Sequence, residues 1–160
     1  MRRLTIFVLT LMAGAVLTVA CSTDKQTTLL QQEENIDKYI LSKYPECEVV
    51  RSNGSNRVIV TPGEGQMTVA DGDSTYVTLE GRVFNTSPGI VFYSDELTVK
   101  ASRDDLMTGL YNGLVGMTRG EEAYIFFSAK YGFDDNIIGV VPSLSAIMFH
   151  VNVRDIKKSN

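Results

Sequence analysis

The chain has 160 residues, of which 44% are hydrophobic and 21% are charged, and its formal net charge is −4. These values are typical of one globular domain with short appendages, and they exclude a collagen, a disordered chain and a disulfide scaffold. The negative charge gives no electrostatic reason to expect a nucleic acid as partner, and 2 cysteines with 1 histidine leave few side chains for thiol or zinc chemistry.

The N-terminus has the layout of an export signal. Arg2 and Arg3 precede an uncharged stretch over residues 4–20, and Cys21 follows it. This order of a charged start and an apolar run predicts a signal peptide over residues 1–20.

The residues around Cys21 resemble a bacterial lipobox, in which the cysteine becomes the lipidated N-terminus. The sequence at 17–21 is Leu-Thr-Val-Ala-Cys. A lipid anchor on Cys21 would hold the protein at a membrane of the bacterial cell envelope, on its periplasmic or outer face. Thr18 stands where such boxes usually have a larger aliphatic residue, so cleavage by an ordinary signal peptidase stays open.

A polar tether and an amphipathic helix are expected next. Residues 21–28 are short and polar, and residues 29–46 form the predicted N-terminal helix, in which Ile36 and Ile40 lie at helical spacing. Pro45 ends the pattern. Such a helix either packs on its own domain or forms the arm of a dimer, and both alternatives stay open.

From residue 47 the hydrophobic period changes to two, which predicts strands. A hairpin is expected around Asn53-Gly54, because this pair supplies the positive φ angles of a tight turn. The other expected strands cover residues 75–84, 91–92, 97–100, 122–128 and 145–155.

One internal helix is predicted over residues 104–115, capped by Ser102 or Asp104, and a loop over residues 129–143. The order of elements predicts an α+β fold over residues 47–160, in which an antiparallel half-barrel sheet wraps around one short helix.

Searches for metal and acid-base motifs are negative. Asp71-Gly72-Asp73 begins like a calcium loop but lacks the third acid, the central glycine and the final glutamate. His150 lies on the strand face opposite Phe149 and is interpreted as a solvated strand residue. Asp134-Asp135 is interpreted as a pair of loop acids that face water. We therefore expect no metal and no cofactor.

The ordered motifs between about residues 57 and 156 resemble the FKBP-type peptidyl-prolyl cis-trans isomerases. No single motif is specific, and the resemblance depends on the whole ordered set. The matching segments are residues 71–81, 91–94, 106–117, 120–123, 131–142 and 147–153.

The resemblance implies a pocket for proline-containing peptides. Its implied catalytic residues are Phe92, Tyr93, Met107, Phe133 and Phe149, with the backbone N–H of Met107 as the donor to substrate. Its implied substrate-binding residues are Leu79, Leu106, Leu110, Val140 and Val141.

Four of these positions depart from the family pattern. Tyr93 stands where the family has an aspartate, Phe133 and Leu79 stand where it has tyrosines, and Leu110 stands where active members often have a tryptophan. Loss of the aspartate removes a charge that orders the pocket, so slow turnover is expected.

The implied chemistry needs no nucleophile, because rotation about an Xaa-Pro bond breaks no covalent bond. An apolar, water-poor surface favours the twisted amide over the planar, more polar one. We expect either a weak isomerase that assists the folding of exported proteins or a catalytically silent FKBP-like module. Such a module would bind peptides or another envelope protein through the pocket or the exposed faces of Tyr124 and Phe126. It also stays open that the pocket residues pack as ordinary core.

Overall fold

The computed structural model describes residues 24–159, so the predicted signal peptide and Cys21 lie outside the described residues. A helix covers residues 24–43. The strands are β1 (Glu48–Ser52), β2 (Ser55–Thr61), β3 (Glu64–Thr68), β4 (Ser74–Phe84), β5 (Pro88–Lys100), β6 (Thr118–Arg119), β7 (Glu122–Phe127) and β8 (Ala146–Lys157). The remaining elements are helix α2 (Thr108–Leu114) and the short 3-10 helix η1 (Ala129–Tyr131). Within residues 24–159, no helix combines the length and apolar character that crossing a membrane requires.

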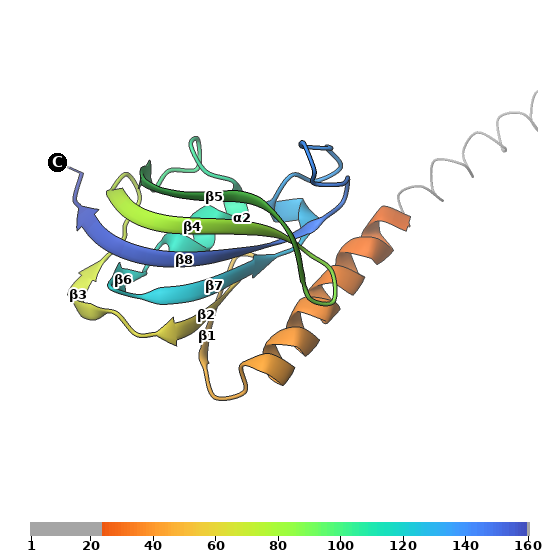
Figure 1. Ribbon diagram of the computed structural model, residues 1–160, viewed down its shortest axis with the longest axis horizontal. Coiled ribbons are helices and arrows are strands. Elements are labelled where there is room, and N and C mark those ends of the chain that lie inside the picture. Colours follow the sequence, from red (N-terminus) through yellow and green to blue (C-terminus); the bar gives the residue numbers. More distant parts are fainter. Residues whose placement is uncertain (1–23, 160) are drawn as a thin grey trace, which may run out of the picture.

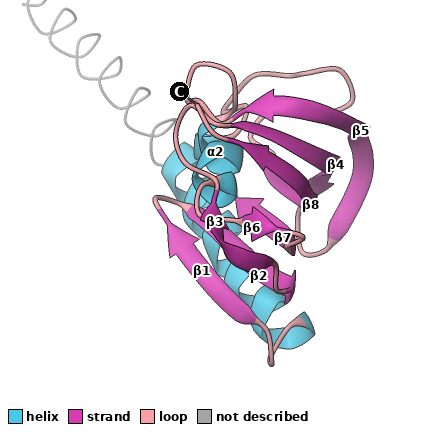
Figure 2. Ribbon diagram, turned by 90° about the vertical axis from the view of Figure 1, so that its left-hand side faces the viewer, coloured by secondary structure: helices cyan, strands magenta, loops and turns pink. Residues whose placement is uncertain are grey.

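Six strands form one antiparallel sheet, in the order β1-β2-β7-β8-β4-β5, and β3 pairs with β6 beside it. The large sheet curls around α2 (Figures 1 and 2). The predicted α+β architecture is therefore confirmed. Two features were not predicted: the pairing of β3 with β6, and the joining of the two short segments at 91–92 and 97–100 into the single strand β5.

The predicted Asn-Gly hairpin joins β1 to β2. Asn53 and Gly54 have φ values of 44° and 82°, and Ser52 pairs with Ser55 across the turn. A Cβ atom on Gly54 would also lie 2.0 Å from the Tyr131 ring. Glycine is therefore required here both by the backbone conformation and by the close approach of η1.

The face of the sheet toward α2 carries the main core. Alternate residues of β4, β7 and β8 point to this face, as their period of two predicted. Its fully buried members from these strands include Val77, Ala123, Ile125, Phe127, Ile147, Val151 and Val153.

Helix α2 begins later than predicted, at Thr108, with Met107 at its N-cap and no side-chain cap. The predicted caps fail because the preceding residues form a turn. The N–H of Leu106 donates to the Ser102 carbonyl at 3.0 Å, and the N–H of Asp104 donates to Ser102 Oγ at 3.2 Å. Leu106 therefore precedes the helix instead of belonging to it.

Two glycines bring α2 close to β7. A Cβ on Gly109 would lie 2.2 Å from the Phe127 ring, and one on Gly113 would lie 2.4 Å from Ile125. Glycine lowers helix propensity by roughly 1 kcal/mol per residue. At these positions that cost is offset by contact between the helix backbone and the sheet, which fixes where α2 presents Leu110.

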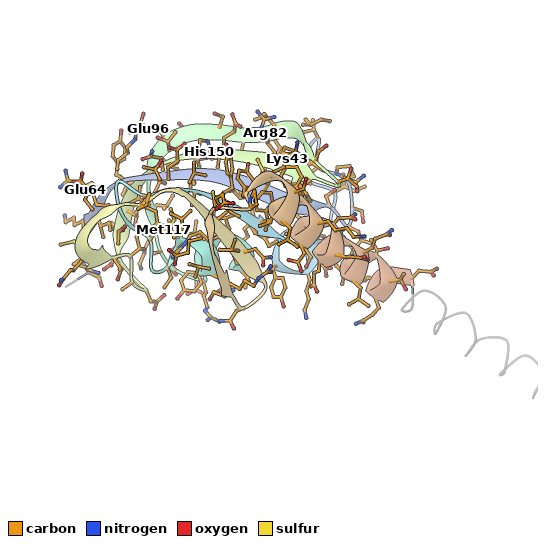
Figure 3. The ribbon with its side chains drawn as sticks, turned by 90° about the horizontal axis from the view of Figure 1, so that it is seen from below. Lys43, Glu64, Arg82, Glu96, Met117 and His150 are labelled. Carbon is orange, nitrogen blue, oxygen red and sulfur yellow. The ribbon has the colours of Figure 1, made fainter. Side chains whose placement is uncertain are left out.

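The N-terminal helix covers the other face of the sheet (Figure 3). Ile36 and Ile40 are buried against a cluster that comprises Val58, Phe84, Phe126, Ala146 and Met148. The helix thus packs on its own domain through Ile36 and Ile40.

Two expectations about this region need correction. Residues 24–28 were expected in the tether, but they continue the helix, which covers residues 24–43. The aromatic residues of β7 are not free docking faces, because Phe126 is fully buried and Tyr124 is half-buried beneath the helix. The sequence alone did not show which sheet face this helix covers.

Asp73 anchors the start of β4 to the C-terminal end of the chain. Its carboxylate accepts hydrogen bonds from the N–H groups of Ala70 at 2.8 Å and Ser159 at 3.0 Å, and from Lys158 Nζ at 2.8 Å. Burial of this carboxylate acts to raise its pKa, but these hydrogen bonds outweigh the burial, so the pKa of Asp73 lies below its ordinary value of 3.8.

The lowered pKa of Asp73 predicts a loss of stability in acid. Its contribution is fully present above the unfolded-state pKa and is lost as the pH falls through the lower folded-state pKa. We expect Asp73→Asn to lower the free energy of unfolding at about pH 7, and we expect this difference from wild type to shrink below about pH 4. Urea denaturation across this range measures it. A difference that stays constant, or that grows in acid, would contradict the assignment.

Candidate functional site

The ten residues predicted for the pocket fall into three groups by exposure. Leu79, Leu110, Val141 and Phe149 are buried in the main core. Phe92, Leu106, Met107 and Phe133 are half-buried and pack against that core. Tyr93 and Val140 are 36% and 59% exposed. The structure therefore brings eight of the ten into one apolar cluster, and it places Tyr93 and Val140 outside that cluster.

Three aromatic rings from different elements meet at this place. The Phe92 ring of β5 lies 5.8 Å from the Phe133 ring at an interplanar angle of 73°, and 5.8 Å from the Phe149 ring of β8 at 83°. This edge-to-face contact is the geometry that aromatic pairs prefer. Phe149 is buried, so this residue packs as ordinary core, which is the alternative that the sequence left open for the pocket residues.

The surface that a ligand can reach is therefore formed by the half-buried members. We name Phe92, Leu106, Met107 and Phe133 the aromatic-aliphatic surface. A separate hollow of about 600 Å³ lies between the N-terminal helix and η1, and none of its lining residues belongs to the predicted ten. The residues that the resemblance implies and the hollow thus lie at different places. The aromatic-aliphatic surface is the better candidate for binding proline, because its side chains are apolar.

Gly81 is a further residue of this site, and the motif over residues 71–81 implied no role for it. It pairs with Tyr93 across β4 and β5 and with Phe149 across β4 and β8. A Cβ on Gly81 would lie 2.7 Å from Phe92 Cζ and 2.8 Å from Phe149 Cε1. A lone glycine inside an alternating strand is the signal that predicts such a close approach.

Met107 supplies an unpaired donor beside these rings. Its carbonyl accepts a hydrogen bond from the Tyr111 N–H at 3.0 Å, whereas its own N–H donates to no acceptor among residues 24–159. The N–H groups at the start of a helix lack intrahelical partners. This group is therefore left without a partner in the described part of the chain.

The loop between η1 and β8 carries two of the predicted pocket residues that pack on the core, Phe133 and Val141. Ile138 and Val141 exchange backbone hydrogen bonds of 3.1 and 2.9 Å, and the Leu144 N–H donates to the Asp134 carbonyl at 2.9 Å. These bonds place Phe133 and Val141 against the core and leave Val140 exposed. The predicted loop is thus an ordered structure.

The titratable residues near the sheet have partners. His150 Nε2 lies 2.7 Å from Glu122 Oε1, and its ring stacks on Tyr124 at 4.7 Å. His150 is therefore a half-buried, paired residue, which corrects the expectation of a solvated one. Asp134 and Asp135 have exposed side chains, as expected of loop acids, and both also pair with Lys25 Nζ, at 2.9 and 3.4 Å. Across the described part of the chain, no group of three His, Cys, Asp or Glu side chains is placed to hold a metal.

One comparison with known proteins identifies a family. The sequence matches the family described as FKBP-type peptidyl-prolyl cis-trans isomerase over residues 65–154, which is more than half of the chain. No curated protein matches the sequence.

Two solved structures share the fold. The structure of the 3 FKBP domains of wheat FKBP73 is similar with a TM-score of 0.62 and 18% identity, covering 71% of this chain and 50% of that chain. The N-terminal domain of FKBP42 from Arabidopsis thaliana is similar with a TM-score of 0.62 and 14% identity, covering 71% of this chain and 94% of that chain. The chain thus spans half the length of the wheat structure, and identities this low show the fold alone.

Proposed function

This chain belongs to the FKBP-type peptidyl-prolyl cis-trans isomerase family, and from this membership we propose that it binds proline-containing segments of unfolded exported proteins and isomerises them slowly. The observation that carries the proposal is the aromatic-aliphatic surface with the unpaired Met107 N–H beside it. Such a surface offers a proline ring an apolar contact, and it offers the neighbouring peptide a hydrogen-bond donor.

The mechanism follows from the electronic structure of the amide. Rotation of an Xaa-Pro bond meets a barrier of about 18–20 kcal/mol, because rotation removes amide resonance. The twisted amide has less charge separation than the planar one. Contact with Phe92, Phe133 and Leu106 excludes water and so favours the twisted state, while the Met107 N–H holds a substrate carbonyl in place. Each interaction lowers the barrier only to the extent that it is stronger in the twisted state.

Slow turnover is proposed because the site lacks a charged side chain. Tyr93 is exposed and stands where the family has an aspartate, and a phenol offers a hydrogen bond but no fixed charge at neutral pH. Removal of one such electrostatic contact typically slows an enzyme by about 10²–10³-fold.

The experiment that tests the activity is exchange NMR on Xaa-Pro peptides with and without the protein. The proposal expects faster cis-trans exchange, in proportion to protein concentration. If exchange is unchanged while peptide resonances still shift, the alternative function holds, in which the chain is a silent peptide-binding module. The contacts of the Phe92 ring with Phe133 and with Phe149 favour this alternative, because these rings fill space that a proline ring would otherwise occupy.

Tyr93→Asp tests the alignment of the site. We expect this variant to accelerate exchange over wild type by about tenfold or more, because it restores a charge at the residue that follows Phe92. Ser94→Asp, at the next and also exposed position of β5, is the matched control and is expected to leave the rate unchanged. Equal rates in Tyr93→Asp and wild type, with both folded, would mean that residue 93 does not stand at the family's aspartate position.

We further propose that the protein acts at the cell envelope, held by a lipid on Cys21. The support is the order of charged residues, apolar run and lipobox-like cysteine at the N-terminus. Labelling of expressing cells with a radioactive fatty acid tests this. Incorporation that is abolished by Cys21→Ala agrees with the proposal, and incorporation that persists in this variant contradicts it.

A further inference from the structure

The N-terminal helix contacts two different parts of the domain along one seam. Gln32, Ile36 and Ile40 are spaced at intervals of four, and so they lie on one side of the helix. The seam is apolar over the sheet, where Ile36 and Ile40 are buried. Nearer the N-terminus it is polar, at Gln32 and Lys25, and there the helix lies beside the loop between η1 and β8 (Figure 1).

Gln32 joins the start of η1 to the end of that loop through one side-chain amide. Its Oε1 accepts a hydrogen bond of 2.9 Å from the Ala129 N–H at the first residue of η1. Its Nε2 donates a hydrogen bond of 2.6 Å to the Leu144 carbonyl just before β8. Both bonds are partly buried, and they join residues about a hundred positions apart in the sequence.

The Leu144 end of the loop depends on such support. Leu144 has φ of 52°, a left-handed conformation that is unfavourable for a leucine. Its N–H donates to the Asp134 carbonyl at 2.9 Å, and its carbonyl accepts from Gln32. Both polar groups of this strained residue are therefore paired, and one of the two partners comes from the N-terminal helix.

We propose that Gln32 is a positioning residue for the candidate site. It closes the segment from Ala129 to Leu144, which carries Phe133 against Phe92 and holds Val141 in the core. The role in peptide binding rests on the proposed function, whereas the ordering of the loop does not. The side-chain amide of Gln32 bonds to the backbone of this segment, at Ala129 and Leu144, and so we assign its effect on the site to the loop.

Lys25 adds a weaker contact to the same loop. Its Nζ lies 2.9 Å from Asp134 Oδ1 and 3.4 Å from Asp135 Oδ2, but all three side chains are at least 36% exposed. Exposed ion pairs are screened by salt and contribute little. The positioning is therefore assigned to Gln32, and it is expected to be insensitive to salt.

The test compares Gln32→Ala with two matched variants of the full chain. Gln31→Ala changes the exposed neighbour of Gln32, and Ile40→Ala weakens the same seam over the sheet. In Gln32→Ala we expect the Ala129 and Leu144 amides to exchange with solvent about fivefold faster or more, and we expect the nuclear Overhauser contact between the Phe92 and Phe133 rings to weaken. Val151 in β8 is expected to keep its wild-type exchange rate, since the sheet is not altered. Gln32→Glu keeps the oxygen that accepts from the Ala129 N–H but loses the Nε2 donor to the Leu144 carbonyl. In this variant we expect the Ala129 amide to stay protected and the Leu144 amide to exchange faster than in wild type.

Affinity for an Xaa-Pro peptide provides the second measurement. Gln32→Ala is expected to bind about fivefold more weakly or worse, whereas Ile40→Ala lowers the melting temperature and keeps the wild-type affinity. Unchanged loop exchange and ring contact in Gln32→Ala, or a loosened loop with wild-type affinity, would overturn the proposal. If wild type itself binds no proline peptide, the proposed function fails, and the exchange and ring-contact measurements alone then decide whether Gln32 positions the loop.

Discussion

Arg57→Met is expected to destabilise the domain by about 3–5 kcal/mol, which is a large part of the roughly 5–15 kcal/mol that holds a domain of this kind folded. Arg57 and Glu121 form a buried ion pair, with side chains only 8% and 5% exposed and an Nε–Oε1 distance of 3.3 Å. Burial acts to lower the pKa of Arg57, while the Glu121 and Glu48 carboxylates oppose this. The variant leaves the Glu121 carboxylate buried without its counter-charge.

The same guanidinium also caps α2. Arg57 Nη1 donates hydrogen bonds of 2.9 and 3.1 Å to the carbonyls of Gly113 and Val115, at the C-terminal end of the helix. A cation at this end interacts favourably with the unpaired carbonyls and the helix dipole. Arg57 thereby holds the helix whose opposite end presents Met107 to the site.

Urea denaturation of single and double variants measures the pair. We expect the double variant Arg57→Met with Glu121→Met to lose less stability than the sum of the two single losses, with a coupling of about 1–3 kcal/mol. Arg51→Met is the matched control, because the ion pair between Arg51 and Asp37 is about half exposed and is worth at most about 1 kcal/mol. Equal losses for Arg57→Met and Arg51→Met would show that the buried pair has no special role.

Phe92→Ala is expected to weaken binding of a proline peptide by about 30-fold or more, the loss typical of a central aromatic contact. Phe92 is the ring that contacts both Phe133 and Phe149, and it is half-buried, so part of it is open to contact from outside the domain. Isothermal titration calorimetry at a temperature where the variant is folded measures the affinity.

Phe84→Ala is the control for that variant. Phe84 lies at the end of the neighbouring strand, but it is 2% exposed and packs beneath the N-terminal helix on the other face of the sheet. Its loss is expected to cost about 3–5 kcal/mol of stability and to leave the peptide affinity unchanged. If both variants lose affinity equally, the effect is general destabilisation and not loss of a binding surface.

The sequence predicted the sheet well, because its strands alternate strictly and one face of each meets the same core. Val77, Leu79, Ile125 and Phe149 all point where their period of two places them. The hairpin at Asn53-Gly54 was equally clear, since its turn type is encoded by two adjacent residues. These features depend on local patterns that a single sequence contains.

Other features depend on residues that are distant in the sequence. The start of α2 was predicted too early, because the N–H groups of residues 104–106 bond to Ser102 in a preceding turn. Which face the N-terminal helix covers, the Arg57–Glu121 pair and the two bonds of Gln32 are all long-range contacts that no local period encodes. The burial of Phe149 beside Phe92 was likewise beyond the sequence, which implied a pocket and left ordinary core packing open as the alternative.

Titration of the isotopically labelled protein with an Xaa-Pro peptide, and with its Xaa-Ala counterpart, measures whether the aromatic-aliphatic surface recognises proline. We expect saturable shifts of the Met107 amide and of the Phe92, Leu106 and Phe133 resonances with the proline peptide, and much weaker shifts with the alanine peptide. Equal responses to the two peptides, or shifts confined to residues elsewhere in the domain, would contradict the claim that this surface recognises proline.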